Sequence, residues 1–430
     1  MRDIVYWIWL SLALTPGSET FRKLIEKFSA PRAIYEADED AILRCIGSTS
    51  RDFDALKDKN TERAEKILEF CEKKNIGILT YSDEAFPISL YEINNPPVLL
   101  YYRGVLPDFN KICMISMVGT RRLTDYGRRN AFIIGHDLAL AGATIVSGMA
   151  TGIDGVSHAG AISAGGVNIA FLGSGIDVCY PEEHKRLARE IVKTGCVMTE
   201  YAPGTRPDSH NFPKRNRLIA GISCATVVIE GRERSGALIT ARYAKKYGKT
   251  VYALPGNVDN KTSEVTNLLI KNGAKLITAS DDVIRDLEFV YTGIINPFKL
   301  GQKLGVRMND VLTELGIACV AQGDAIFSTF PSKNRKKKDN VEEKRSELEN
   351  AAGASVSAVS AESESSIENF GFDKDTLNIY RSIPAGEECA IESLVSGEYS
   401  LPKIMKALLK LEMGHFVVML PGEKVRRKLK

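Results

Sequence analysis

The chain has no cysteine arrangement that would suggest a metal centre or a disulfide framework. Its 430 residues include eight cysteines, which are scattered, and neither a Cys-x-x-Cys pair nor a cluster of histidines lies near them. Structural zinc sites and secreted disulfide scaffolds need such spacings. We therefore expect a protein of a reducing compartment, the cytoplasm, with no metal and no cofactor.

Long apolar runs are also lacking. The stretch Ile4–Leu14 is apolar, but it is too short to span a bilayer and is followed by Pro16-Gly17. It has no basic leading segment and no cleavage pattern of a signal peptide. We expect Trp7 and Trp9 to pack within a helix, and we expect no association with membranes.

The chain also lacks a large excess of positive over negative residues. The formal net charge is +3, so binding to nucleic acid has to rest on local clusters of cations. The chain lacks the Gly-x-x-x-x-Gly-Lys-Ser/Thr motif of nucleotide hydrolysis and the Gly-x-Ser-x-Gly elbow of serine hydrolases. We therefore expect a protein without catalytic residues. A hydrophobic content of 44% is ample for a folded core.

What the sequence does have is a regular alternation between residues 112 and 256. Short apolar runs end in glycine-rich turns, and amphipathic helical stretches separate them. In the first unit, Ile112–Val118 is a predicted strand, Asp125 a predicted helix cap and Gly142 the predicted end of that helix. The pattern predicts an α/β fold: a Rossmann-like, doubly wound parallel sheet of about six strands.

The loops at the predicted carboxyl ends of the strands carry glycines and cations. Backbone N–H groups of such turns can approach an anion, and the following helix N-terminus favours negative charge. Arginine suits phosphate, and aromatic rings suit stacked bases. The ordered set of loops predicts a phosphate-binding edge whose members are Gly119-Thr120-Arg121-Arg122, Ser147-Gly148 and the segment Asn211–Arg217 with Phe212.

These loops are collinear with the signature of a known family. The segments concerned are Val118–Arg121, Ser147–Asp154 with His158, Tyr180-Pro181, Phe212–Gly221, Glu230, Ser235–Ala241 and Pro255-Gly256. From about Ile76 to Ile284 the chain resembles the DNA-processing protein A (DprA, or Smf) family. The resemblance implies an extended Rossmann domain that forms a homodimer, binds single-stranded DNA and helps to load the RecA recombinase in natural transformation. One departure is Val265, where the family usually has glycine.

The resemblance also implies a set of site residues. Arg121 matches the arginine of the DNA-binding pocket, and Arg215 and Arg217 match the Arg-Asn-Arg motif of the same edge. Lys185 and Lys249 are further candidate phosphate contacts. The full predicted DNA-binding set is Gly119, Thr120, Arg121, Arg122, Ser147, Gly148, Lys185, Lys214, Arg215, Asn216, Arg217 and Lys249.

Other motif residues have a structural interpretation. His158 either pairs with Asp154 or supports the loop, because no second acid or nucleophile accompanies the two residues. Glu230, at a strand end, is expected to accept backbone N–H bonds from a neighbouring loop. Ser235-Gly236 is expected to cap a helix.

Outside the central region the composition changes. Residues 1–75 are predicted to form a small helical domain of helix-hairpin-helix (SAM-like) type, with turns at Gly17 and Gly47. Residues 76–295 form the Rossmann-like domain, and 296–368 a largely flexible linker with a lysine-rich run at 333–338. Residues 369–430 are predicted to form a winged helix that binds either duplex DNA or protein. On its third helix Lys403, Lys406 and Lys410 share one face.

Two rival functions come from other classes. Nucleotide phosphoribohydrolases have a related Rossmann core, but their Pro-Gly-Gly-x-Gly-Thr loop has no match beyond Glu230 and Ser235-Gly236. Release of adenine from AMP would identify such an enzyme. A duplex-binding regulator acting through the winged helix would prefer double strands and would tolerate the loss of Arg121.

Overall fold

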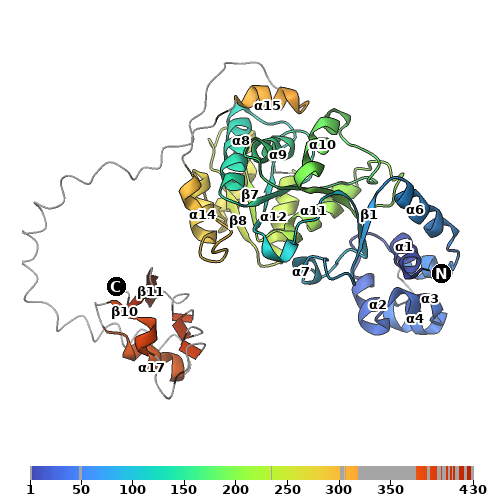
Figure 1. Ribbon diagram of the computed structural model, residues 1–430, viewed down its shortest axis with the longest axis horizontal. Helices are drawn as coiled ribbons and strands as arrows, with labels where there is room; N and C mark the ends of the chain where they lie inside the picture. The colour runs from blue at the N-terminus through green and yellow to red at the C-terminus, as the bar shows by residue number, and fades with distance from the viewer. Residues whose placement is uncertain are drawn as a thin grey trace, which may run out of the picture. The chain divides into compact units, whose positions relative to one another are not determined.

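The computed structural model describes most of the chain, in two compact units, residues 1–332 and 333–430. The described residues are 2–47, 51–233, 235–300, 305, 307–317, 374–384, 388–394, 399, 403–404, 407–408, 410–411, 416–420 and 424–427. Of the predicted linker 296–368, the residues from 318 on, including the lysine run, lie outside them. Its first part differs from the prediction: it forms η4 (Pro297–Lys299) and α15 (Met308–Glu314), because Met308 and Leu312 are buried in the apolar cluster of the sheet. The fold of each unit is given separately below (Figure 1).

Among the described residues of the first unit, nine strands form one sheet in the order β1-β2-β6-β5-β4-β3-β7-β8-β9. From β6 to β9 all neighbours are parallel, whereas β2 is antiparallel to β6 and β1 to β2. The α/β prediction of a Rossmann-like, mostly parallel sheet is confirmed. The strands are β1 (Gly77–Thr80), β2 (Leu99–Gly104), β3 (Met114–Val118), β4 (Thr144–Ser147), β5 (Asn168–Phe171), β6 (Cys196–Thr199), β7 (Ala225–Val228), β8 (Thr250–Ala253) and β9 (Lys275–Leu276).

Helices cover both faces of this sheet. The helices that follow β2 are α8 (Asp125–Leu140), α9 (Ile153–Ser163), α10 (Lys185–Thr194), α11 (Asn211–Ile222), α12 (Gly236–Lys246), α13 (Glu264–Lys271), α14 (Ser280–Leu287) and α15 (Met308–Glu314). Buried residues of α8, α9 and α10 belong to one apolar cluster, and those of α11, α12 and α13 to another. Short 3-10 turns are η1 (Phe109–Lys111), η2 (Glu182–His184), η3 (Lys261–Ser263) and η4 (Pro297–Lys299). The sheet is therefore the middle of three layers.

Two local predictions differ from the structure. Thr124, and not Asp125, caps α8, because its hydroxyl accepts the N–H of Gly127 at 3.1 Å. Asp125 is the first helical residue and pairs with Arg128 at 3.0 Å. Val265 lies inside α13 and is fully buried. A helix has negative φ throughout, so a β-branched residue is accommodated at that position.

The N-terminal helices pack against the edge of the sheet that carries β1 (Figure 1). They are α1 (Asp3–Ala13), α2 (Thr20–Phe28), α3 (Pro31–Glu36), α4 (Glu39–Ile46), α5 (Arg51–Lys57) and α6 (Glu62–Lys73), and α7 (Ile88–Tyr91) follows β1. Trp7 and Trp9 are buried within α1, as predicted. Gly17 and Gly47 have φ of +84° and +82°, which suits the predicted turns. Residues of these helices share one apolar cluster with α8 and α9.

The second unit has a small sheet in the order β10-β12-β11. Its described elements are α17 (Lys374–Ser382), β10 (Glu388–Ala390), η5 (Ile391–Leu394), β11 (Val417–Leu420) and β12 (Lys424–Arg427). Ile404, Leu408 and Leu411 are buried, and Lys403 and Lys410 are exposed. Lys406 lies outside the described residues, and the winged helix stays a prediction. Within the described part of the chain, no helix is both long and apolar enough to cross a membrane.

Candidate nucleic-acid interface

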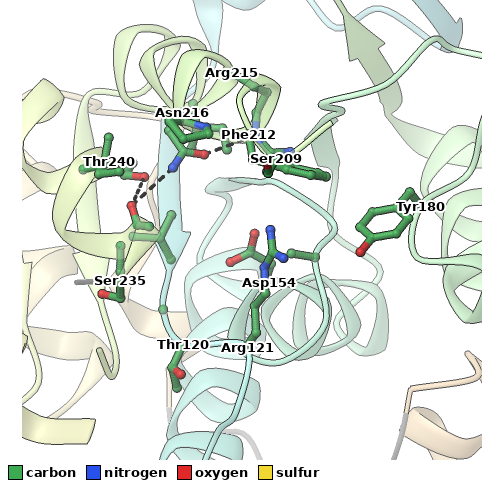
Figure 2. A pocket seen from close by; sticks show the side chains of 18 of the residues that line it. Thr120, Arg121, Asp154, Tyr180, Ser209, Phe212, Arg215, Asn216, Ser235 and Thr240 are labelled. Atoms are coloured by element: carbon green, nitrogen blue, oxygen red, sulfur yellow. Dashed lines mark hydrogen bonds between the residues drawn. The ribbon is translucent and has the colours of Figure 1, made fainter. Parts of the chain in front are cut away.

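An open cavity of about 510 Å³ lies where β3, β4 and β7 end. Segments that follow five strands, β3 to β7, supply its walls, because parallel strands bring their carboxyl ends to one edge of the sheet. Figure 2 shows Arg121 and Asp154 pointing toward the helix that carries Phe212 and Arg215. Of the predicted site residues, the cavity is lined by Gly119, Thr120, Arg121, Asp154, Arg215, Asn216, Ser235 and Gly236.

Arg121, Phe212 and Tyr180 form a stack of planar groups in this cavity. The guanidinium of the exposed Arg121 lies 4.9 Å from the centre of the Phe212 ring. Phe212 also contacts Tyr180, with ring centres 5.5 Å apart and a tilt of 40° between the rings, and Tyr180 is 43% exposed. A cation over an aromatic face is held by the ring quadrupole, so Phe212 positions Arg121. We name these three residues the Arg-Phe-Tyr shelf.

Beneath the shelf, Arg215 and Asp154 are buried. Arg215 donates to the carbonyl oxygens of Gly148, at 2.8 Å, and of Phe171. Burial lowers the pKa of Arg215 to about 10, so it remains charged at neutral pH. Burial raises the pKa of Asp154, and the charges of Arg215 and Arg121 oppose that rise. Two guanidinium groups thus face one carboxylate, and the cavity keeps a positive floor.

The glycine loop after β4 serves this buried pair rather than an external anion. The N–H of Gly148 donates to Asp154 at 3.2 Å, and the hydroxyl of Ser147 donates to the carbonyl of Met117 at 2.6 Å. A Cβ on Gly148 would lie 2.5 Å from the Arg215 guanidinium, so glycine is needed for this close approach. The polar groups of Ser147 and Gly148 that were expected to meet phosphate therefore have internal partners.

The opposite wall comes from the start of α12. Asn216 and Thr240 both donate to the carbonyl oxygen of Gly236, each at 3.2 Å. Ser235 occupies the N-cap position, but its side chain makes no cap hydrogen bond, which corrects the predicted capping role. The residue lines the cavity, but its hydroxyl is buried on the side of Gly231 and has no partner among the described residues.

Glu230 holds the loop that precedes α8. Its carboxylate accepts the N–H of Thr124 at 3.0 Å and the hydroxyl groups of Thr124 and Thr262. The residue is only 1% exposed. This is the backbone-binding role expected from its position, and a carboxylate so occupied cannot serve as a base on a ligand.

His158 does not pair with Asp154, so that alternative is wrong. The residue is fully buried, and its Nδ1 lies 2.8 Å from the side-chain oxygen of Asn168. Burial lowers the pKa of His158 to about 4. It is therefore a neutral core residue beneath the loop.

Three predicted cations lie away from the cavity. Arg217 is 1% exposed and forms an ion pair with Glu200, at 2.6 Å, on the side of the N-terminal helices. It follows Arg215 on a helix, so the two side chains leave in different directions. Lys249 precedes β8 and therefore lies at the amino edge of the sheet, near Glu92. Lys185 begins α10 and pairs with Glu182.

Two further predicted cations remain accessible: Arg122 is exposed beside Arg121, and Lys214 is half-buried beside Arg215. The sequence analysis did not single out Ser209 or Thr240, which also line the cavity. Ser209 lies in the loop before α11 and carries no charge or aromatic ring that would mark it. Thr240 lies within the family segment Ser235–Ala241 and follows Gly236 by four residues on a helix, and these two features were its available signals.

The fold and the cavity define a Rossmann-like α/β protein with a cationic, aromatic-lined binding site at the carboxyl edge of its sheet. The family model described as DNA recombination-mediator protein A matches residues 77–288. The chain is similar to Protein Smf of Synechocystis sp., with 35% identity over 286 residues that cover 66% of this chain and 72% of that protein. The chain therefore belongs to the DprA/Smf family of DNA-processing proteins.

A sequence and a solved structure of DprA from Streptococcus pneumoniae extend the comparison. The DNA processing protein DprA is 41% identical over 209 residues, covering 48% of this chain and 73% of that protein. The X-ray structure of DNA processing protein A superposes with a TM-score of 0.58 at 32% identity and covers 66% of this chain and 98% of that one. The family supports a role as a DNA-processing recombination mediator.

Proposed function

We propose that the cavity at the carboxyl edge binds single-stranded DNA without catalysis. The observation that carries the proposal is the Arg-Phe-Tyr shelf, in which an accessible guanidinium is stacked on an aromatic ring inside an open cavity. Non-specific single-strand sites combine these two elements: cations that hold phosphates and aromatic faces that stack bases. Membership of a family of DNA recombination mediators supports the same conclusion.

Each residue has a defined part in this binding mode. Arg121 and Arg122 hold phosphates at the mouth of the cavity, and Tyr180 offers its ring to a base. Lys214 adds charge at the rim. Arg215 and Asp154 act indirectly, since they fix the loops beneath the shelf. Few of these contacts depend on the identity of a base, so little sequence preference is expected.

We infer further that the bound strand is passed to the RecA recombinase and that the protein acts as a homodimer. Two cavities on one dimer would engage one strand together and raise the effective affinity. Both steps come from the family resemblance. Light scattering of the purified chain tests the dimer, and a strand-exchange assay with RecA tests the transfer.

The first experiment is a titration of labelled single- and double-stranded oligonucleotides at several salt concentrations. Arg121→Ala should weaken single-strand binding about 10- to 100-fold, the range for a charge-assisted hydrogen bond. Loss of one phosphate contact should also reduce the salt slope by about 0.7. Lys249→Ala removes one positive charge at the other edge of the sheet and should leave binding unchanged.

Other outcomes would favour the rival functions. Full single-strand binding by Arg121→Ala would place the function elsewhere in the chain. A preference for duplex in that variant would indicate the second unit. Release of adenine from AMP would indicate a phosphoribohydrolase, although the full engagement of Glu230 by hydroxyl and N–H groups supports a non-enzymatic site.

A further inference from the structure

A second cavity, of about 210 Å³, lies next to the first one. It forms between α10 and the sheet, and three cations line it: Arg103 from β2, and Lys185 and Arg189 from α10. Lys185 and Arg189 are four residues apart, so they lie on the same face of the helix. This cavity is where the structure places Lys185, which the sequence analysis assigned to the DNA-binding edge.

The two cavities share a wall. Ala150 and Tyr180 line the first cavity, and their chain neighbours Met149 and Cys179 line the second. Consecutive Cα atoms are about 3.8 Å apart, so only a single thickness of backbone separates the two spaces at both points. Tyr180, which is 43% exposed, stands on this wall. A strand lying on Tyr180 therefore has a cationic cavity on each side.

The charges of the second cavity are only partly balanced, because Lys185 pairs with Glu182 and the two arginines remain. Asp177 is the one carboxylate among its lining residues, and it accepts the N–H of Gly204 at 2.8 Å. Arg103 is half-buried, and its Nε has no hydrogen-bond partner among the described residues. Arg189 is exposed and forms no ion pair in the described part of the chain. Arg189 is therefore the cation of this cavity that is free to pair with an entering anion.

We propose that this second cavity is a phosphate subsite that extends the single-strand path beyond Tyr180. Arg103 and Arg189 hold the backbone phosphate, and Lys185 adds charge at the rim. The remaining walls are aliphatic, including Leu172, Ile176 and Val197, so the subsite contacts backbone and sugar and stacks no base. This inference rests on the proposed function of the first cavity, because the strand enters the second cavity by crossing the shelf.

Oligonucleotide length separates the two sites. Binding of oligo(dT) of about 4 and about 16 nucleotides, the range of single-strand site sizes, is measured by fluorescence anisotropy for the full chain. Arg189→Ala should weaken binding of the long oligonucleotide about 3- to 10-fold, lower its salt slope by about 0.7 and leave the short one unchanged. Arg103→Gln should act in the same direction. Arg186→Ala is the matched control, since Arg186 is an exposed arginine of the same helix that does not line the cavity.

The outcomes are distinguishable. A loss in Arg189→Ala that is equal for both lengths, or no larger than in Arg186→Ala, would overturn the subsite. Arg121→Ala reports separately on the first cavity: if it leaves binding of both lengths intact, the proposed function itself fails. Thermal unfolding of each variant shows whether the fold is retained, and Arg189→Gln serves as a second replacement at a position that is exposed and contributes little to the core.

Discussion

The guanidinium of Arg121 lies over the ring of Phe212, 4.9 Å from its centre, although the two residues come from different strand–helix units of the sheet. The ring is also in contact with Tyr180, so it is the middle member of the shelf. Phe212→Leu keeps an apolar side chain but removes the aromatic face. Arg121 then loses the ring that holds it, so we expect single-strand binding to weaken about 2- to 5-fold, the range for the loss of one exposed cation–π contact. Anisotropy titration measures this change.

Tyr243→Leu is the control for that variant. Tyr243 also pairs with a second aromatic ring, Tyr247, but it lies in the interior of α12 and does not line the cavity. Its replacement should leave the affinity for single strands as in the wild type. Equal affinities of wild type and Phe212→Leu would show that the ring only packs.

Arg217 is expected to act on stability and not on DNA binding. Its ion pair with Glu200 is almost fully buried, with side chains 1% and 4% exposed. Arg217→Ala leaves a buried carboxylate unpaired, which typically costs about 3–5 kcal/mol of unfolding free energy. Urea denaturation measures the loss. In Arg217→Met/Glu200→Leu, two apolar groups replace the pair, and most of the stability should return.

The same double variant distinguishes the two roles of Arg217. If the folded double variant binds single strands as the wild type does, Arg217 is a structural residue. A selective loss of binding with normal stability would restore the phosphate-contact role that the sequence pattern predicts.

Gly148 should not tolerate a side chain. A Cβ there would lie 2.5 Å from the Arg215 guanidinium, whose other contacts are to fixed carbonyl oxygens. Gly148→Ala should therefore displace Arg215, lower the melting temperature and weaken single-strand binding by loosening the floor of the cavity. Gly236→Ala is the comparison, because a Cβ at that position meets only Asn216 at 3.6 Å. Its melting temperature should be unchanged or raised, since alanine reduces the freedom of the unfolded chain by about 0.4–1 kcal/mol.

His158 should make stability depend on pH. Its pKa is about 4 in the folded protein and about 6.5 in an unfolded chain, so the unfolded state binds more protons between these values. The stability it contributes is complete above about pH 6.5 and is lost as the pH falls toward 4, with a total of about 3 kcal/mol. Urea denaturation across this range should show a shallower loss for His158→Gln.

Asp137 changes stability with pH in the direction opposite to His158. The contribution of the histidine is therefore measured as the difference between the pH profiles of wild type and His158→Gln. Burial raises the pKa of Asp137 to about 6, and its contribution falls as the pH rises through that value. Identical pH profiles for wild type and His158→Gln would mean that the pKa of His158 is the same in the folded and unfolded protein, which would contradict this prediction.

The sequence predicted the mostly parallel α/β sheet because the sheet follows from local patterns. Apolar runs that end in glycine identify strands and their carboxyl ends, and parallel pairing then brings Arg121 and Arg215 together. The direction of each side chain does not follow from such patterns. Arg215 and Arg217 belong to one motif, yet one faces the cavity and the other faces Glu200. That outcome depends on the rotation of α11 about its axis, which tertiary packing sets.

Lys249 differs from the prediction because of its position relative to a strand. Lys249 was grouped with the phosphate contacts, but it comes before β8 and not after it, and so lies at the opposite edge of the sheet. The unpaired hydroxyl of Ser235 could not have been found from sequence, since Thr124 and Ser235 look equally suited to capping. The structure gives Thr124 a backbone N–H to bind and leaves Ser235 without one.

The ion pair of Arg217 also limits how the N-terminal helices can be removed or exchanged for those of another protein. Arg217 lies against Gly17 and Pro16 of the N-terminal helical region, whose side chains share the apolar cluster of the sheet. The same helix, α11, carries Phe212 and Arg215 at its other end. Removal of the N-terminal helices would expose Arg217 and Glu200 to water, which would then compete for their ion pair. Such a truncation would loosen the helix that forms the binding edge, so the N-terminal helices are not an exchangeable module.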